Sequence, residues 1–304
     1  MKISIITINY NGSKETLKLL ESLKTQTDQD FEVIVVDNAS EEADFKNLEK
    51  YYTTNQNLWR AALHIYRQEG NLGFSGGNNV GIRQALQGGS DWVVLLNNDT
   101  WVENDFVERL KAFLSDRGGV VGLPLNEGEK VAYYGKIEWL KPTLNHEYGI
   151  MNNELGTNDH NSKFIIHNSF YAIGGAVAIH KNVFEKIGFL DEKYFLYFED
   201  ADFSIRARKA WFNVSITENL KVNHHISSSA KKLGSSTLLR YHYRNALYFN
   251  FKNSPWYIKL LVWPWSLIIV IKQLSKLVIR YNIEQSKAIL AGVIDFYKNR
   301  MGKI

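Results

Sequence analysis

Short apolar runs rich in β-branched residues alternate with segments of helical periodicity over the first 125 residues. The runs are ISIITIN (3–9), FEVIVVDN (31–38), LHIYR (63–67), WVVLLNND (92–99) and VVG (120–122). Between them, the apolar residues of 13–26, 76–87 and 103–115 fall on one helical face. Apolar strands that alternate with amphipathic helices are typical of βαβ units. The sequence therefore predicts an α/β fold, a mostly parallel, Rossmann-like sheet flanked by helices.

The pattern loosens after about residue 126. The Asn-rich stretch 145–162 has weak periodicity and is interpreted as a loop or lid, and 170–180 is apolar with a pair of glycines. Acidic residues open the segment 199–212, as they do in a first helical turn. The sequence from 237 onward is predicted to be helical. We therefore expect one domain over 1–236, divided into halves 1–125 and 126–236, and a helical extension over 237–304.

The composition excludes several classes of site. The chain has no cysteine, which excludes disulfides, thiolate nucleophiles and iron–sulfur clusters. The N-terminal MKISIITINYNG has too short an apolar run for a signal peptide and is interpreted as a first strand, which favours a cytoplasmic protein. Nucleic-acid binding is not expected, because the α/β body is acidic.

The positive charge is concentrated in the C-terminal tail. From Ala230 to the end there are 13 Lys/Arg and 2 Asp/Glu, giving +11, whereas the preceding residues carry −7. The apolar run LLVWPWSLIIVI (260–271) is shorter than the roughly 20 residues of a spanning helix. With its tryptophans and basic stripe, the tail is predicted to lie on a membrane surface, peripherally at the inner face. The alternative is a helix pair packed on the body.

Polar side chains follow four consecutive strands of the predicted sheet. They are Thr7, Asn9 and Tyr10, then Asp37 and Asn38, then Arg67 and Asn71, and finally Asn97 to Asp99. In open parallel sheets, ligands bind beyond the carboxyl ends of the strands. The motifs GxGxxG and GxxxxGK[ST] are absent where a dehydrogenase or a P-loop enzyme needs them. The class of site that remains is one in which side chains hold a nucleotide and a carboxylate recruits a divalent cation.

Seven motifs in chain order resemble the landmarks of one enzyme family. They are ISIITINYNG, VIVVDNAS, NLGFSGGNNVGI, LLNNDT, GGAVAIHK, FLDEKYFLYFEDADFSIRARKAWF and HHISSSAKK. This order is similar to that of the inverting family-2 glycosyltransferases, over about residues 1–250. It looks most like the rhamnosyltransferase-type branch that builds bacterial surface polysaccharides. The resemblance implies a GT-A fold.

The resemblance also implies a donor site at the strand ends. Asp37 is expected to accept hydrogen bonds from the base or ribose, although an aspartate here also fits a helix N-cap. The glycines of NLGFSGGNN would allow close backbone approach to the ribose and sugar. The residues expected to bind the nucleotide sugar are Thr7, Asn9, Tyr10, Asp37, Asn71, Gly73, Gly77, Asn78, Asn97 and Asn98.

Metal and base positions follow from the same motifs. Asp99 corresponds to the last acid of the family's DxD motif, with Asn97 at the first position, and is expected to bind Mg²⁺ or Mn²⁺. His224 or its neighbour His225 would be the second ligand, and the Ser-rich sequence that follows favours His224. Asp200 corresponds to the catalytic base that takes the acceptor's proton.

The acceptor side is assigned to three residues, Gly174, Gly175 and Glu199. The alternative for Glu199 and Asp202 is a charged helix N-terminus.

The expected function is metal-dependent transfer of a sugar, with inversion, from a dTDP- or UDP-linked donor to a glycan, a lipid-linked saccharide. Arg240 and Arg244 are candidates for phosphate contacts. A sugar nucleotidyltransferase is the rival enzyme class, but the stretch after strand one lacks the Gly-rich basic loop that it requires. A catalytically inactive nucleotide-sugar-binding module is the third alternative.

Overall fold

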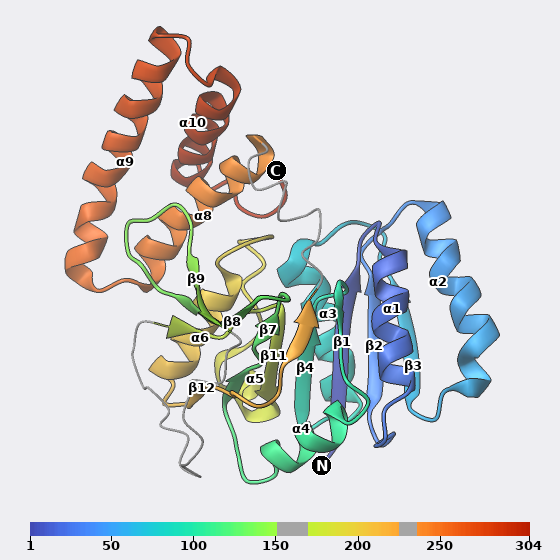
Figure 1. Cartoon of the computed structure of the whole chain (residues 1–304). Coiled ribbons are helices and arrows are strands. Elements are labelled where there is room, and N and C mark those ends of the chain that lie inside the picture. The colour runs from blue at the N-terminus through green and yellow to red at the C-terminus, as the bar shows by residue number, and fades with distance from the viewer. Residues whose placement is uncertain (151–169, 225–235) are drawn as a thin grey trace.

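The computed structural model describes residues 1–150, 170–224 and 236–304. A seven-stranded sheet forms the centre of this described part (Figure 1). Its strands, in spatial order, are β12 (Val214–Ile216), β6 (Val120–Gly122), β11 (Ala176–His180), β4 (Trp92–Leu96), β1 (Ile3–Asn9), β2 (Glu32–Asp37) and β3 (Ala62–Arg67). Strands β4, β1, β2 and β3 are parallel, and β11 runs antiparallel between β4 and β6. The predicted mostly parallel sheet is confirmed.

Helices cover both faces of this sheet. They are α1 (Ser13–Lys24), α2 (Glu42–Asn55), α3 (Gly73–Gln87), α4 (Phe106–Leu114), α5 (Lys181–Ile187) and α6 (Glu199–Lys209), with a short 3-10 helix η1 (Gln56–Leu58) after α2. Helix α2 was not predicted, because only Leu48 of its residues is buried and it has almost no apolar stripe. The segment predicted as 76–87 begins at Gly73, and the strand predicted as 92–99 ends at Leu96.

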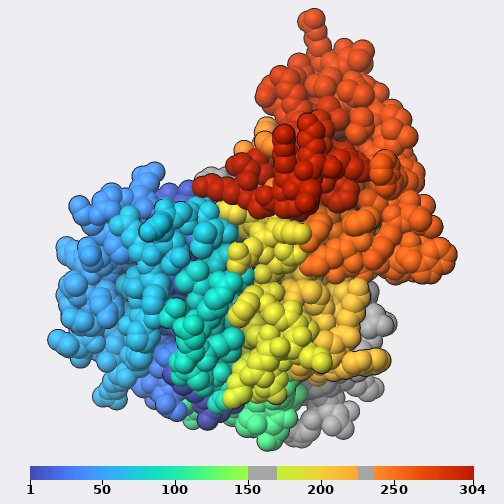
Figure 2. Space-filling model, turned by 180° about the vertical axis from the view of Figure 1, so that it is seen from behind, coloured from blue at the N-terminus to red at the C-terminus, as the bar shows by residue number. Residues whose placement is uncertain are grey.

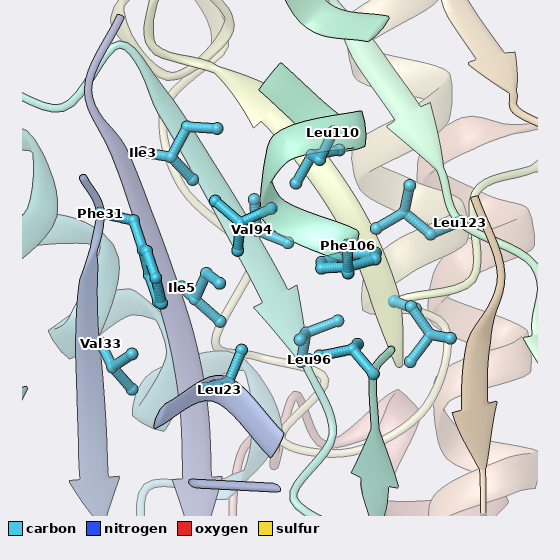
Figure 3. Close-up of a cluster of buried hydrophobic side chains, with 14 of the residues drawn as sticks. Ile3, Ile5, Leu23, Phe31, Val33, Val94, Leu96, Phe106, Leu110 and Leu123 are labelled. Carbon is cyan, nitrogen blue, oxygen red and sulfur yellow. The ribbon is translucent and has the colours of Figure 1, made fainter. Parts of the chain in front are cut away.

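The alternation of side chains along the strands divides the core into two layers. Ile3 and Ile5 of β1 face α1 and α4, where they pack with Leu23, Phe106 and Leu110 (Figure 3). Ile6 points to the other face and packs against α3. Burial on both faces explains why these strands are continuous apolar runs.

A second sheet occupies part of what was interpreted as loosely structured chain. Its strands are β10 (Phe170–Tyr171), β8 (Lys130–Lys136), β7 (Leu125–Asn126), β13 (Val222–His224) and β5 (Thr100–Trp101), with β9 (Asn145–Ile150) paired to β8. The loop predicted at 145–162 is therefore wrong for residues 145–150, and the rest of it lies outside the described residues. Antiparallel pairing of β13 with β5 places His224 opposite Thr100.

Three helices form the C-terminal layer, which stands away from the sheet (Figures 1 and 2). They are α8 (Ser236–Asn253), α9 (Trp256–Val278) and α10 (Ile283–Tyr297). Helix α8 contacts α6, α9 and α10. Lys252 of α8 lies 2.7 Å from Asp191 and 2.8 Å from Asp202, so ion pairs join this layer to the body. The domain boundary at 236 stays a prediction.

Helix α9 is longer than the apolar run that predicted it. It has 23 residues and continues through Pro264, whose missing N–H leaves the carbonyl of the exposed Leu260 without its helical partner. Among the described residues it is the one helix long and apolar enough to cross a membrane by length and composition. The two arginines considered for phosphate contacts are engaged by other groups of the protein. Arg240 pairs with Asp295 at 2.6 Å, and Arg244 is fully buried against backbone carbonyls.

Candidate active site

The ends of β1 and β2 place two polar side chains against each other. Asn9 lies opposite Asp37 in the register, and its Nδ2 donates to Asp37 Oδ1 at 2.9 Å. Both residues are fully buried. Asp37 also accepts from the backbone N–H of Ser40 and lies 3.7 Å from Arg67 Nε. The N-cap of α2 is Glu41, so the alternative role of Asp37 as that cap is not observed.

Two further residues predicted for the donor lie beside this pair on or after β1. Thr7 is fully buried, and its hydroxyl has no hydrogen-bond partner in the part of the chain that the structure describes. Tyr10 is 52% exposed. A buried hydroxyl without a partner costs free energy, which is consistent with a position that a ligand completes.

The stretch NLGFSGGNN (71–79) contains the N-cap Leu72 and the first residues of α3. Asn71 Oδ1 accepts from the N–H of Gly73 at 2.8 Å, and Asn78 Nδ2 donates to Phe74 O. Gly73 has φ 72°, and a Cβ on it would lie 2.4 Å from Phe195 O. This glycine is therefore required by packing within the protein. At Gly77 a Cβ would lie 3.1 Å from Ile8 Cδ1, so the start of α3 lies directly on β1.

The residues after β4 separate into different roles. Asn98 Nδ2 donates to Thr16 Oγ1 and the carbonyl of Gly12, which ties the turn to α1. The backbone N–H of Asn97 donates to Gly175 O at 2.8 Å, which ties the same turn to the segment before β11. Asn98 therefore supports the turn.

Asp99 meets His224, as the metal prediction requires. His224 Nε2 lies 3.4 Å from Asp99 Oδ1, and His224 Nδ1 lies 3.3 Å from Glu127 Oε1. Burial opposes the charged imidazole, but the two carboxylates more than offset it and raise the pKa of His224. In the described residues no group of three or more His, Asp and Glu side chains is arranged as a complete metal site. An oxygen and an imidazole ligand side by side fit a divalent cation that completes its coordination with diphosphate oxygens. His225 lies outside the described residues.

Asp200 lies in the first turn of α6 and is held by two backbone N–H groups. Gly174 N donates to Oδ2 at 3.0 Å and Ala201 N donates to Oδ1 at 2.8 Å. Burial raises the pKa of the Asp200 carboxyl, and these two hydrogen bonds oppose the rise. A carboxylate with a raised pKa and a fixed orientation is suited to accept a proton.

The acceptor-side glycines bring the base and the LLNNDT turn together. A Cβ on Gly174 would lie 3.2 Å from Asp200 Cβ, and one on Gly175 would lie 2.9 Å from Asn97 Nδ2. Glu199 is buried, its Oε2 has no partner among the described residues, and burial followed by the charge of Asp200 raises its pKa well above the ordinary value. The predicted contact of Gly174, Gly175 and Glu199 with the acceptor stays a prediction.

The charged helix N-terminus considered for the acidic cluster is observed at Asp202. This buried carboxylate lies 2.7 Å from Arg206 Nε and also pairs with Lys252. Glu199 has no such cation partner in the part of the chain that the structure describes.

Two residues near the site were missed in the sequence. Glu127 follows β7 and reaches His224. His146 of β9 interacts electrostatically with Asp200, Glu127 and His224, and burial lowers its pKa. Neither lies in a recognisable motif, and β9 was interpreted as loop, so only the pairing of the second sheet reveals them.

Similarity to known proteins agrees with this arrangement. Residues 4–188 match the model of glycosyl transferase family 2. The chain belongs to this family. It is 26% identical over 253 residues to the low-salt glycan biosynthesis hexosyltransferase Agl10 of Haloferax volcanii, covering 80% of this chain and 73% of the relative. It is 24% identical over 233 residues to the dTDP-rhamnosyl transferase RfbF of Shigella flexneri, covering 76% and 71%.

The fold is shared with solved structures of such enzymes. The mannosyltransferase PcManGT of Pyrobaculum calidifontis, solved with GDP-Man and Mn²⁺, superposes with a TM-score of 0.56 at 12% identity. The similarity covers 98% of this chain and 87% of that one. The predicted GT-A fold and glycosyltransferase class are confirmed.

The raised pKa of Asp200 predicts the acid limb of the activity profile. Below its pKa the carboxyl is protonated and has no free lone pair for the acceptor's proton, so kcat should fall about tenfold per pH unit. Because burial raises that pKa, we expect the limb above the ordinary aspartate value of about 3.9. The check is kcat measured by steady-state kinetics between about pH 4 and 8, the range over which aspartate and histidine groups titrate. Nucleotide binding is measured in parallel. A kcat that stays constant down to about pH 4 would contradict it.

Proposed function

We propose that this glycosyltransferase moves a sugar, with inversion, from a nucleotide-diphosphate donor to a hydroxyl of a glycan. The observation that carries the proposal is Asp200, a half-buried carboxylate held by Gly174 and Ala201 beside the strand ends. The relatives named hexosyltransferase and dTDP-rhamnosyl transferase support a hexose-type sugar, with a dTDP-linked donor favoured over a UDP-linked one.

The chemistry is a single displacement. The acceptor's O–H proton passes to Asp200 as the oxygen forms its bond to the anomeric carbon. The bond from that carbon to the diphosphate oxygen breaks on the opposite face, and the electron pair leaves with the nucleoside diphosphate. Asp37, ordered by Asn9, is proposed to bind the base or ribose.

Asp99 and His224 would hold Mg²⁺ or Mn²⁺ at the diphosphate. The cation supplies positive charge that neutralises the leaving group. Because Asn97 is uncharged, the protein itself contributes few negative charges to that cation.

A membrane surface is the proposed location of the acceptor. Helix α9 exposes Leu267, Ile268 and Ile271 at 58%, 63% and 56%. Basic residues lie on or beside the same helix, at Lys259, Lys272, Lys276 and Arg280. An apolar helical face with basic residues suits anionic lipid headgroups and the acyl boundary. The proposed acceptor is a lipid-linked saccharide at the cytoplasmic face of the cell membrane, as in surface-polysaccharide synthesis.

Replacement of the base separates the proposed function from its alternatives. Asp200→Asn should lower kcat about 10²- to 10⁴-fold, because the amide cannot accept the proton, while donor affinity changes little. Release of nucleoside diphosphate from a panel of nucleotide sugars, with calorimetric donor binding, measures both. A binding module would turn over no donor in the wild type, and a nucleotidyltransferase would release pyrophosphate or form a nucleotide sugar instead.

Removal of the proposed metal carboxylate should show in the metal dependence. Asp99→Ala is expected to lower kcat/KM about 100-fold at a fixed Mn²⁺ concentration, since a hard oxygen ligand is lost. Titration of Mn²⁺ against activity gives the measurement, and Asp116→Ala, an exposed carboxylate in the loop after α4, is the control. Full activity of Asp99→Ala without divalent cation would refute the assignment.

The membrane proposal is tested by surface substitutions in α9, since deletion of α9 and α10 would also uncover buried α8. Changing Leu267, Ile268 and Ile271 to Gln should reduce the fraction of protein that floats with anionic vesicles at least about tenfold. The reason is that each aliphatic side chain that enters the membrane contributes about 1.5–3 kcal/mol to binding. Leu58→Gln with Trp211→Gln is the control, since these exposed apolar residues lie elsewhere. Unchanged flotation of the α9 variant would overturn the proposal.

A further inference from the structure

The segment before the catalytic helix has an unusual backbone. Phe195, Tyr197 and Phe198 have φ values of 63°, 71° and 76°. Non-glycine residues avoid this left-handed region, because their Cβ approaches the carbonyl oxygen. Three such residues in four positions persist only where the surroundings hold them. Phe198 is also the N-cap of α6, so this segment sets where Glu199 and Asp200 begin.

One buried amide of α8 holds that backbone. Asn245 Nδ2 lies 2.9 Å from the carbonyl oxygen of Tyr194, 2.7 Å from that of Leu196 and 3.2 Å from that of Tyr197. Asn245 is fully buried, and its Oδ1 accepts from Arg244 Nε at 3.0 Å, which fixes the orientation of the amide. The carbonyls turned inward by the left-handed residues therefore share one donor group.

Two ring stacks from the same helix support the segment. Tyr241 stacks on Phe195 with ring centroids 5.4 Å apart, and His242 stacks on Tyr197 at 4.2 Å. Both ring nitrogens of His242 are buried without a hydrogen-bond partner in the described chain, and burial lowers its pKa to about 4. His242 is thus a neutral ring that acts through its face.

The same segment also contacts the donor side. Phe195 O accepts from the N–H of Phe74 at 2.7 Å, next to Gly73, whose missing side chain allows this approach. The backbone between 194 and 198 therefore connects the start of α3, the start of α6 and helix α8.

We propose that Asn245 is a positioning residue for Asp200: by holding the 194–198 backbone in its left-handed form, it aims the base relative to the donor-side helix. This inference rests on the proposed glycosyl transfer. It makes the first helix of the C-terminal layer a part of the catalytic centre, in addition to any anchoring by α9.

Two substitutions of Asn245 test the role. Asn245→Ala removes the donor, and Asn245→Asp keeps the shape but presents oxygens to three carbonyls. Both should lower kcat about 10- to 100-fold with donor KM changed less than about twofold, because a base misplaced by a fraction of an ångström reacts poorly. The acid limb of the kcat–pH profile should move to lower pH as water reaches Asp200. Unchanged kcat and limb in both folded variants would overturn the proposal.

Asn250→Ala is the matched control. Asn250 is an equally buried amide of α8, but its Nδ2 donates to Ala246 O and its Oδ1 accepts from Leu140 N, away from the 194–198 segment. It should lower the melting temperature without a change in kcat per folded molecule. If its kcat falls as in the Asn245 variants, the effect is general loosening of α8 and the proposal fails.

A second pair of variants keeps the proposal testable if Asn245 variants fold poorly. His242→Ala should lower kcat, and His242→Phe should restore most of it, since the ring nitrogens make no hydrogen bonds. Equal activity of His242→Ala and the wild type would overturn the proposal that α8 holds the 194–198 backbone.

Hydrogen exchange separates this inference from the proposed function. The amides of 195–202 should exchange at least about tenfold faster in Asn245→Ala or His242→Ala than in the wild type, while those of β1 and β4 keep their protection. Unchanged exchange at 195–202 would overturn the proposal that α8 holds this backbone. If the wild type turns over no nucleotide sugar but the variants exchange faster as expected, the proposed glycosyl transfer is overturned. The contacts of α8 with the 194–198 backbone would then have a purely structural role.

Discussion

The parallel register of β1 against β2 and β4 determines where the side chains proposed to bind the donor lie. Asn9 pairs with Asp37 across β1 and β2, and Ile6 pairs with Leu95 across β1 and β4. Parallel strands end at one edge, so the polar residues that follow each strand are brought to the same side of the molecule. The two apolar layers of the core hold this register, because a slip of one residue would turn each buried side chain to the opposite face.

The part of the fold that depends on local pattern could be predicted, and the part that depends on distant pairing could not. Strands β1, β2 and β4 and helices α1 and α4 follow from apolar periodicity. Helix α2 has a single buried residue, and the strands β5, β7 and β10 have two residues each, so none has a readable period. The second sheet exists only because such short strands meet partners far along the chain.

The same distinction applies to the candidate site. The motifs that resemble the family locate Asp200, Asp99 and His224, and the structure brings the last two together. Glu127, His146 and Asn245 belong to no motif, and their roles depend on neighbours that are distant in sequence. Gly73 was predicted to make room for a ligand, whereas the space beside it is filled by Phe195. A glycine in a motif shows that two groups approach closely, but not whether the second group is ligand or protein.

The pairing of β13 with β5 has a consequence for the synthesis of the chain. Asp99 leaves the ribosome well before His224, and the two meet only when β13 takes its place between β5 and β7. Until then the proposed cation site has its carboxylate, Asp99, but lacks its imidazole. The proposed cation site therefore forms only after both sheets have assembled, so its affinity for the cation would appear late in folding.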